Sequence, residues 1–201
     1  MTGAGGDRVR VRPGSRFPLG ATPGPGGTNF AVSSGVAEGM LLCLFDDADA
    51  ETRVVLPEYG AGVWHGFVEG VGAGQAYGYR ATGPWDPARG VRCNPAKLLL
   101  DPYARATTGP VRFGPEVLGH DADDPDRASR LDSAGHVPRS LVVDPAVDRP
   151  DAAARPWYRY ADTVVYEVHV KGFTTGHPGV PPELRGTYAG LAHDAAGAHL
   201  V

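Results

Sequence analysis

Short apolar runs separated by glycine and proline fill the first eighty residues. The runs lie at 28–34 (TNFAVSS), 40–45 (MLLCLF), 53–56 (RVVL), 63–68 (VWHGFV) and 75–80 (QAYGYR). Alternation of apolar and polar residues over such lengths predicts β-strands, and the glycines and prolines between them predict tight turns. Short strands at close intervals indicate a mainly β fold of the sandwich type.

One face of each predicted strand is expected to fill the core of the sandwich. Residues 63–68 present Val63, His65 and Phe67 on one face and Trp64 on the other, because side chains alternate along a strand. The pattern alone leaves open which of these two faces is buried. The predicted core consists of Phe30, Val32, Leu42, Leu44, Val54, Phe67, Tyr77 and Tyr79.

The pattern changes after residue 80. Prolines at 84, 87, 95 and 102 disfavour long helices. Residues 109–151 are the least regular part of the chain and include an acidic stretch at 120–126, which we interpret as a solvated surface turn. Residues 163–170 (TVVYEVHV) predict a strand and residues 188–201 a helix. A strand, loop and helix in this order begin a βα series, whose strand needs parallel neighbours, so we expect the chain to stop inside a domain.

Composition and charge limit the kinds of partner that we expect this chain to bind. Hydrophobic residues make up 42% of the 201 residues and charged residues 21%, which suits a globular protein. The formal net charge is −4, and a mildly acidic chain lacks the basic surface that nucleic acids or anionic membranes attract. We therefore expect no nucleic-acid or membrane partner, and a neutral polar partner such as a sugar polymer fits better.

No motif indicates a metal or an organic cofactor. Cys43 and Cys93 form no CxxC pair, and a disulfide between them stays open at this stage. The acidic stretch lacks the spacing of an EF-hand, and the glycine clusters form no dinucleotide-binding fingerprint. The first 14 residues lack the apolar centre of a signal peptide, and no run approaches the ~18 apolar residues of a membrane span. The expected location is the cytoplasm.

Four segments, in this order, closely resemble the bacterial glycogen-debranching enzymes of the isoamylase type, in the α-amylase superfamily of glycoside hydrolases. They are PLGATPGPGGTNFAVSS, VWHGFVEGVGAGQAYGYR, GPWDPARGVRCNPAKLLLDPYA and VVYEVHVKGFTTGHPGVPPELRGTYAGLAH. The resemblance covers about residues 18–193. Two departures are Cys93, where the family usually has an aromatic residue, and the last eight residues, DAAGAHLV, which replace a more apolar helix.

The resemblance implies an immunoglobulin-like sandwich of the glycogen-binding-module type, followed by a truncated (β/α)₈ barrel. The implied organisation is a flexible N-terminus at 1–16, the sandwich at 17–106, an irregular linker at 107–161 and an incomplete barrel at 162–201. Residues 163–170 would be the first barrel strand and residues 188–201 the first helix. A whole barrel needs roughly 250 residues, so most of it would be missing.

The implied activity is hydrolysis of α-1,6 branch linkages in glycogen or limit dextrin, without a cofactor. Retaining hydrolysis needs two carboxyl groups about 5 Å apart, and the resemblance places them on later strands. Glu167 and His169 share one face of the predicted strand but do not supply that pair, and we interpret both as structural. We therefore assign no catalytic residue and expect this chain alone to be inactive.

Exposed aromatic rings are the candidates for glucan contact, because they can cover the apolar face of a pyranose. The candidates are Trp64, Trp85 and Trp157. Packing between the sandwich and the barrel is the alternative role for these rings, and the one we favour for Trp64 and Trp85. A stand-alone glucan-binding module without catalysis remains an alternative function, as does the same region of an isoamylase or a trehalose-releasing hydrolase.

Overall fold

The structure is a computed structural model that describes residues 9–144 and 158–199. The chain divides into two compact units, Met1–Pro150 and Asp151–Val201. The expected N-terminal segment 1–16 lies partly, and Trp157 wholly, outside the described residues. None of the helices that the structure describes has both the length and the hydrophobicity that a bilayer crossing requires.

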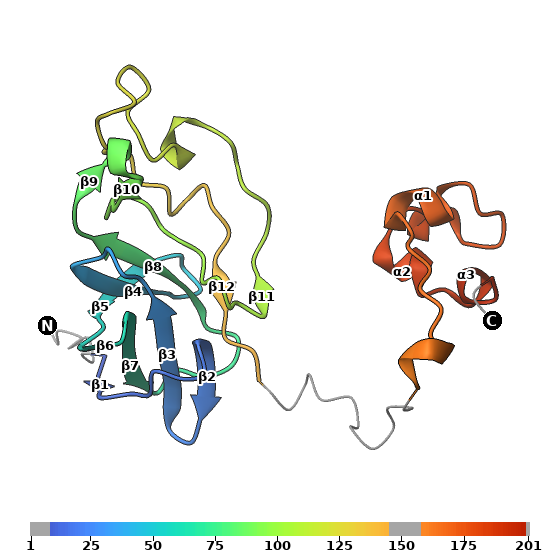
Figure 1. Cartoon of the computed structure of the whole chain (residues 1–201), viewed down its shortest axis with the longest axis horizontal. Coiled ribbons are helices and arrows are strands. Elements are labelled where there is room, and N and C mark those ends of the chain that lie inside the picture. Colours follow the sequence, from blue (N-terminus) through green and yellow to red (C-terminus); the bar gives the residue numbers. More distant parts are fainter. Residues whose placement is uncertain (1–8, 145–157, 200–201) are drawn as a thin grey trace, which may run out of the picture. The chain divides into compact units, whose positions relative to one another are not determined.

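The first unit is mainly β and consists of two sheets packed face to face (Figure 1). The first sheet contains β1 (Val11–Arg12), β2 (Gly20–Gly24), β3 (Gly27–Ser33), β6 (Glu58–Gly60) and β7 (Val63–Glu69). The second sheet contains β4 (Gly39–Phe45), β5 (Glu51–Val55), β8 (Ala76–Thr82), β11 (Ala106–Thr107) and β12 (Ser140–Leu141). The expected sandwich is therefore present, with antiparallel pairing throughout.

The core lies between the two sheets. Of the eight residues expected there, seven are buried, among them Phe30, Leu42 and Tyr77, which have no exposed surface. Phe67 is the exception, and that prediction was wrong. The inner face of β7 carries Trp64 and Val68, whereas Phe67 lies half-buried on the outer face with the Arg12 guanidinium 4.9 Å above its ring.

The chain beyond β8 stays attached to the second sheet. A short ladder joins β9 (Trp85–Asp86) to β10 (Val91–Arg92) on either side of the 3₁₀ turn η1 (Pro87–Arg89), and η2 (Pro115–Val117) follows later. The chain then returns as β12, which pairs with both β8 and β11. We call residues 94–142 the strap, because they run across the second sheet and end by extending it.

Within residues 158–199, the second unit contains only short helical elements. They are η4 (Tyr160–Asp162), α1 (Val170–Thr175), η5 (Pro182–Leu184), α2 (Tyr188–Leu191) and α3 (Asp194–Gly197). The strand expected at 163–170 is absent: residues 163–169 pair with no strand, Val164 and Val165 are 92% and 86% exposed, and α1 begins at Val170. A strand forms only through hydrogen bonds to neighbouring strands, and the described part of this unit offers none. The helix expected at 188–201 is divided into α2 and α3.

Candidate functional site

Trp64 belongs to the core side of the first sheet. It lies opposite Val32 on β3 and Tyr59 on β6, and its ring packs against the core. The Nε1 atom is buried without a hydrogen-bond partner among the described residues. Trp64 is partly buried and therefore acts mainly as a packing residue, whereas its neighbour Tyr59 is largely open to solvent.

Tyr59 was not a candidate from sequence. Its ring lies 4.6 Å from the Trp64 ring, centroid to centroid and tilted by 38°, and Tyr59 is 52% exposed. The pair forms a small aromatic surface at the edge of the first sheet. Tyr59 stands in a three-residue strand without apolar alternation, so its contact with Trp64 could not be predicted from the local pattern.

Trp85 lies half-buried in β9 beneath a surface loop. Its Nε1 donates a hydrogen bond to the backbone oxygen of Asp126 at 2.7 Å. A Cβ atom added to Gly119 would lie 3.7 Å from Cη2 of the ring, so the loop backbone passes close to the indole. Of the three predicted tryptophans, Trp64 and Trp85 are thus both largely engaged in packing, and the structure does not describe Trp157.

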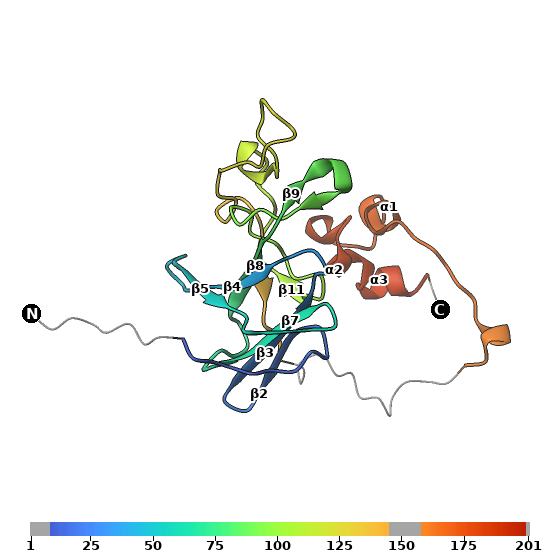
Figure 2. The same cartoon turned by 60° about the vertical axis from the view of Figure 1, so that its left-hand side comes forward.

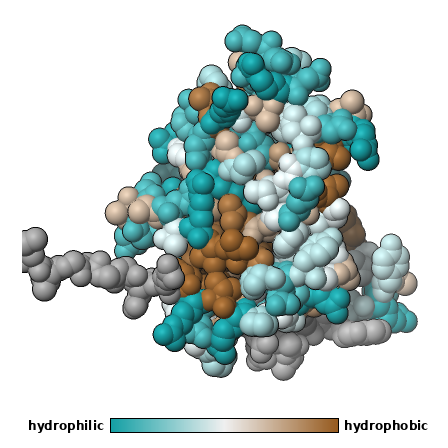
Figure 3. Space-filling model, turned by 90° about the vertical axis from the view of Figure 1, so that its left-hand side faces the viewer, coloured by the Kyte–Doolittle hydropathy of each residue, from teal (hydrophilic) through white to brown (hydrophobic). Residues whose placement is uncertain are grey.

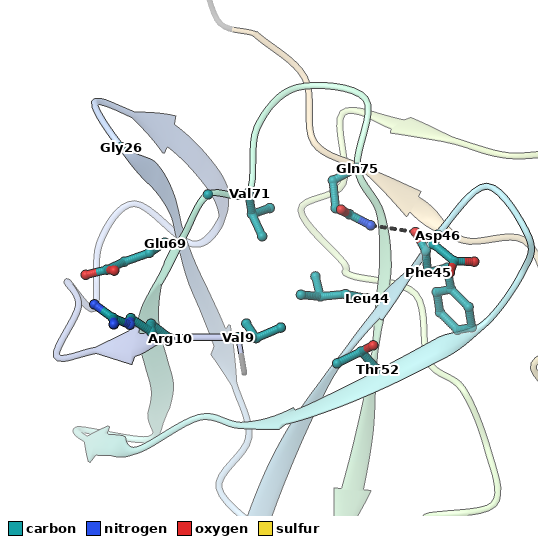
Figure 4. Close-up of a pocket in the computed structure, with 11 residues that line it drawn as sticks. Val9, Arg10, Gly26, Leu44, Phe45, Asp46, Thr52, Glu69, Val71 and Gln75 are labelled. Atoms are coloured by element: carbon teal, nitrogen blue, oxygen red, sulfur yellow. Dashed lines mark hydrogen bonds between the residues drawn. The ribbon is translucent and has the colours of Figure 1, made fainter. Parts of the chain in front are cut away.

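A cavity of about 670 Å³ opens where the two sheets separate, at the ends of β4 and β7 (Figure 4). Val9, Leu44 and Val71 point into it, while Arg10 and Glu69 lie at one side. Apolar side chains also gather in one patch on the face that Figure 3 presents. Among the described residues that line the cavity, buried Phe45 is the only aromatic one, so stacking of a sugar ring has little support there.

A buried guanidinium organises the outer side of the second sheet. Arg80 on β8 has no exposed surface, and its Nε and Nη2 donate to the two oxygens of Glu51 at 2.7 and 2.9 Å. The same Nη2 also bonds to Asp132 of the strap at 2.9 Å, and Nη1 bonds to the Pro95 oxygen at 3.0 Å. Three separate segments therefore meet at one arginine, as bidentate pairing allows.

The ion pair with Arg80 strongly lowers the pKa of Glu51. Burial disfavours its carboxylate, but hydrogen bonds from Arg80 and Arg53 outweigh that cost and lower its pKa to about 2. Nearby, burial followed by the hydrogen bond and charge of Glu51 raises the pKa of the Cys43 thiol to about 12, which makes this cysteine unreactive. Cys43 and Cys93 are both free, so no disulfide joins them.

The lowered pKa of Glu51 predicts a loss of stability in acid. Its ordinary value is 4.5 and its folded value about 2, so ionised Glu51 stabilises the fold above pH 4.5 and loses this effect as the pH falls toward 2. We expect the free energy of unfolding, measured with urea, to decrease less between pH 4.5 and 2 in Glu51→Gln than in the unmodified chain. Asp47→Asn, at an exposed position, is the control and should keep the original slope. Equal slopes in Glu51→Gln and the unmodified chain would contradict this assignment.

Lys97 is a second buried cation that holds the strap. Its ammonium donates to the backbone oxygens of Glu116 and Leu131, both at 2.7 Å, and to Ser129 Oγ at 3.1 Å. Burial lowers the pKa of this group. The three acceptors all lie at least 19 residues away along the chain, so the local sequence around Lys97 carries no sign of this burial.

Glu167 and His169 lie before and at the start of α1 in the second unit. Glu167 is exposed, and His169 Nδ1 accepts a hydrogen bond from Gly172 N at 3.0 Å at the start of α1. This is the capping role that a side-chain acceptor performs at a helix start. No group of three or more potential metal ligands occurs within residues 9–144 and 158–199.

Comparison with known proteins shows what the first unit is similar to. Residues 18–104 match the model of carbohydrate-binding module 48, the isoamylase N-terminal domain. The chain as a whole is similar to glycogen-debranching enzymes. It is 46% identical to the "Glycogen operon protein GlgX homolog" of Mycobacterium bovis, over 98% of this chain and 28% of the relative. It is also 46% identical to the "Glycogen debranching enzyme" of Cronobacter sakazakii, over 93% of this chain and 28% of the relative.

These figures confirm the resemblance expected from the four sequence motifs. The chain spans little more than a quarter of the length of the curated relatives it matches. Solved pullulanases share its fold. The enzyme from Bacillus acidopullulyticus gives a TM-score of 0.58 at 20% identity, over 88% of this chain and 18% of that one. The Anoxybacillus enzyme complexed with maltotetraose gives a TM-score of 0.56 at 23% identity, over 89% of this chain and 21% of that one.

Proposed function

We propose that this chain is part of a glycogen-debranching glycoside hydrolase that cleaves α-1,6 branch linkages in glycogen or limit dextrin. The observation that carries the proposal is 46% identity to debranching relatives across 98% of the chain. That similarity continues through the second unit, well beyond the matched module at 18–104. The substrate class follows from the relatives' printed names and from the module's description.

Within that proposal, the first unit is an immunoglobulin-like module and residues 162–201 begin the catalytic barrel. Residues 17–106 would form the module and 107–161 the connection between the two, although β11 crosses this boundary and β12 lies within the connection. Residues 163–169 would become the first barrel strand once parallel neighbours are present. The cytoplasmic location expected from sequence stays a prediction.

Hydrolysis would depend on parts of the relatives that this chain does not match. In the described part of the second unit, the carboxylates Asp162, Glu167, Glu183 and Asp194 are all exposed, whereas a paired acid and nucleophile must flank a bound glycosidic linkage. We expect the 201-residue chain to release no reducing sugar from limit dextrin. A chimera that joins it to the remaining part of the Mycobacterium bovis relative should restore release.

The matched control is the same relative lacking the segment that this chain replaces. Release by the chain alone would overturn the assignment of hydrolysis to the remainder. A folded chimera that stays inactive would argue against the debranching role. The size of the released products would separate debranching from trehalose release, the other activity that the sequence left open.

A glucan-binding module without catalysis is the second candidate function, and exposed Tyr59 on the Trp64 ring favours it. Affinity electrophoresis of the chain in gels containing glycogen tests it directly. If the rings bind glucan, Tyr59→Ala and Trp85→Ala should each migrate faster than the unmodified chain in glycogen, and equally in its absence. Unretarded migration of all three proteins would leave packing as the role of these aromatic residues.

A further inference from the structure

Residues 119–129 form a hairpin that is largely self-contained. Ser129 N donates to the Gly119 oxygen at 2.9 Å, Asp121 N donates to the Arg127 oxygen at 2.8 Å, and an isolated bridge links His120 to Ala128. The Arg127 side chain pairs with Asp121 at 3.0 Å inside the same hairpin. We call residues 119–129 the acidic hairpin. It was expected as a solvated turn, and its internal bonds give it a defined shape.

The base of the acidic hairpin is fixed to the module. The side-chain amide of Asn94, which is buried, donates to the Gly119 oxygen at 3.0 Å and to the Ser129 oxygen at 2.8 Å. Both ends of the hairpin are therefore tied to one residue. In Figures 1 and 2 the loop rises at the end of the first unit where β9 lies.

Beyond its base, the acidic hairpin has one hydrogen bond to the rest of the described chain. This bond is the one from Trp85 Nε1 to the Asp126 oxygen, at 2.7 Å. The remaining hydrogen bonds and ion pairs of residues 120–128 given by the described structure join residues within the hairpin. A rigid loop with a fixed base and a single bond near its tip can turn about that base when the bond breaks.

We propose that the acidic hairpin is a gate over Trp85, which covers the indole while the Trp85–Asp126 bond is made and exposes it when that bond breaks. The freed indole face then stacks on the apolar face of a glucose unit in an α-glucan. This inference rests on the proposed glucan role of the module. Only the open state binds, so the apparent affinity is reduced by the fraction of molecules that are open.

The proposal predicts that weakening the closed state tightens glucan binding. Trp85→Phe keeps an aromatic face but removes the N–H donor, and loss of one such bond should tighten maltoheptaose binding by about fivefold. A second variant replaces residues 122–126 by Asn-Gly, a two-residue turn that suits the hydrogen-bonded pair Asp121 and Arg127. It keeps the indole and should bind more tightly as well. Trp85→Ala should bind more weakly than the unmodified chain.

Binding would be measured on the whole chain by fluorescence titration with maltoheptaose and by electrophoresis in glycogen. Asp47→Asn is the control, because Asp47 is exposed and lies outside both the acidic hairpin and the candidate aromatic residues, and its affinity should not change. In one outcome, the unmodified chain binds maltoheptaose while neither Trp85→Phe nor the shortened hairpin binds it more tightly. That result would contradict the gate but leave the glucan role of the module in place. If no variant binds, both the gate and the glucan role of the module fail.

Discussion

A chain of residues 9–104 is expected to lose cooperative unfolding, whereas a chain of residues 9–144 should keep it. The match to the module family ends at residue 104, but the second sheet continues through β11 and β12. Removing β12 uncovers the edge of β8 and takes Val142, which is 2% exposed, out of the core. The folded module therefore needs the strap as well as the matched residues.

The shortened chain also loses partners of buried polar groups, so its loss of stability is larger than the missing apolar contacts alone would cause. Without the strap residues beyond 104, the buried ammonium of Lys97 loses its three acceptors, and Arg80 loses Asp132. Asp101 N loses its bond to Ser140 Oγ, beside the carboxylate that accepts from buried Tyr77 at 2.8 Å. A buried polar group without its partner costs about 1–3 kcal/mol, and more when it is charged. Several such losses together exceed the stability of a typical small domain.

Circular dichroism during thermal unfolding would compare the two lengths. The chain of residues 9–144 should show a single sharp transition, since the second unit is a separate compact body. The chain of residues 9–104 should show a broad, shallow change from the start. A sharp transition at the same midpoint for both lengths would mean that the strap contributes nothing to folding.

The long strands were predictable because their signals are local. Alternation placed strands at 28–34 and 63–68, and a compact apolar run placed one at 40–45; the structure has β3, β7 and β4 there, to within a residue or so at each end. By contrast, β2 has the sequence GATPG, without alternation, and it is a strand only because it pairs with β3. Strands that exist through pairing alone cannot be found from local pattern, and the same holds for β11 and β12.

The reverse error occurred at 163–170, where the local pattern is strong but no partner is present. TVVYEVHV has the β-branched composition of a buried strand, and residues 163–169 are nonetheless unpaired in the described structure. Phe67 shows a related limit. Alternation correctly separated the two faces of β7, but the choice of the inner face depends on register with β3, where Phe30 lies opposite Gly66.

The candidate site was only partly predictable for the same reason. Tryptophans stand out in a sequence because of their chemistry, but their surroundings depend on distant segments. Trp85 meets Asp126, 41 residues later, and Arg80 meets Asp132, 52 residues later. At the end of an alternating strand, Arg80 has the pattern of a solvent-exposed position. Arg80 is completely buried because the strap covers it, and the sequence near Arg80 does not predict that contact.

Replacing Arg80 is expected to give the largest effect of any single substitution in the described chain. Arg80→Met keeps the length and apolar stem but removes the buried cation, and leaves Glu51 and Asp132 with only the half-exposed Arg53 as a partner among the ion pairs described. Removing one partner of a buried ion pair typically costs about 3–5 kcal/mol, because the remaining charge is left uncompensated. Urea unfolding at neutral pH should show a decrease of this order in the free energy of unfolding.

Arg53→Met provides the matched control for the Arg80 variant. Arg53 also bonds to Glu51, at 2.9 Å, but 48% of its side chain is exposed, so its loss should cost no more than about 1 kcal/mol. Arg80→Met should also remove most of the acid dependence assigned to Glu51, since Arg80 supplies the main hydrogen bonds that lower that pKa. Equal destabilisation by the two substitutions would show that burial of the guanidinium does not decide its contribution. A large effect of Arg80→Met alone would instead identify this arginine as the residue through which the sheet and the strap fold as one body.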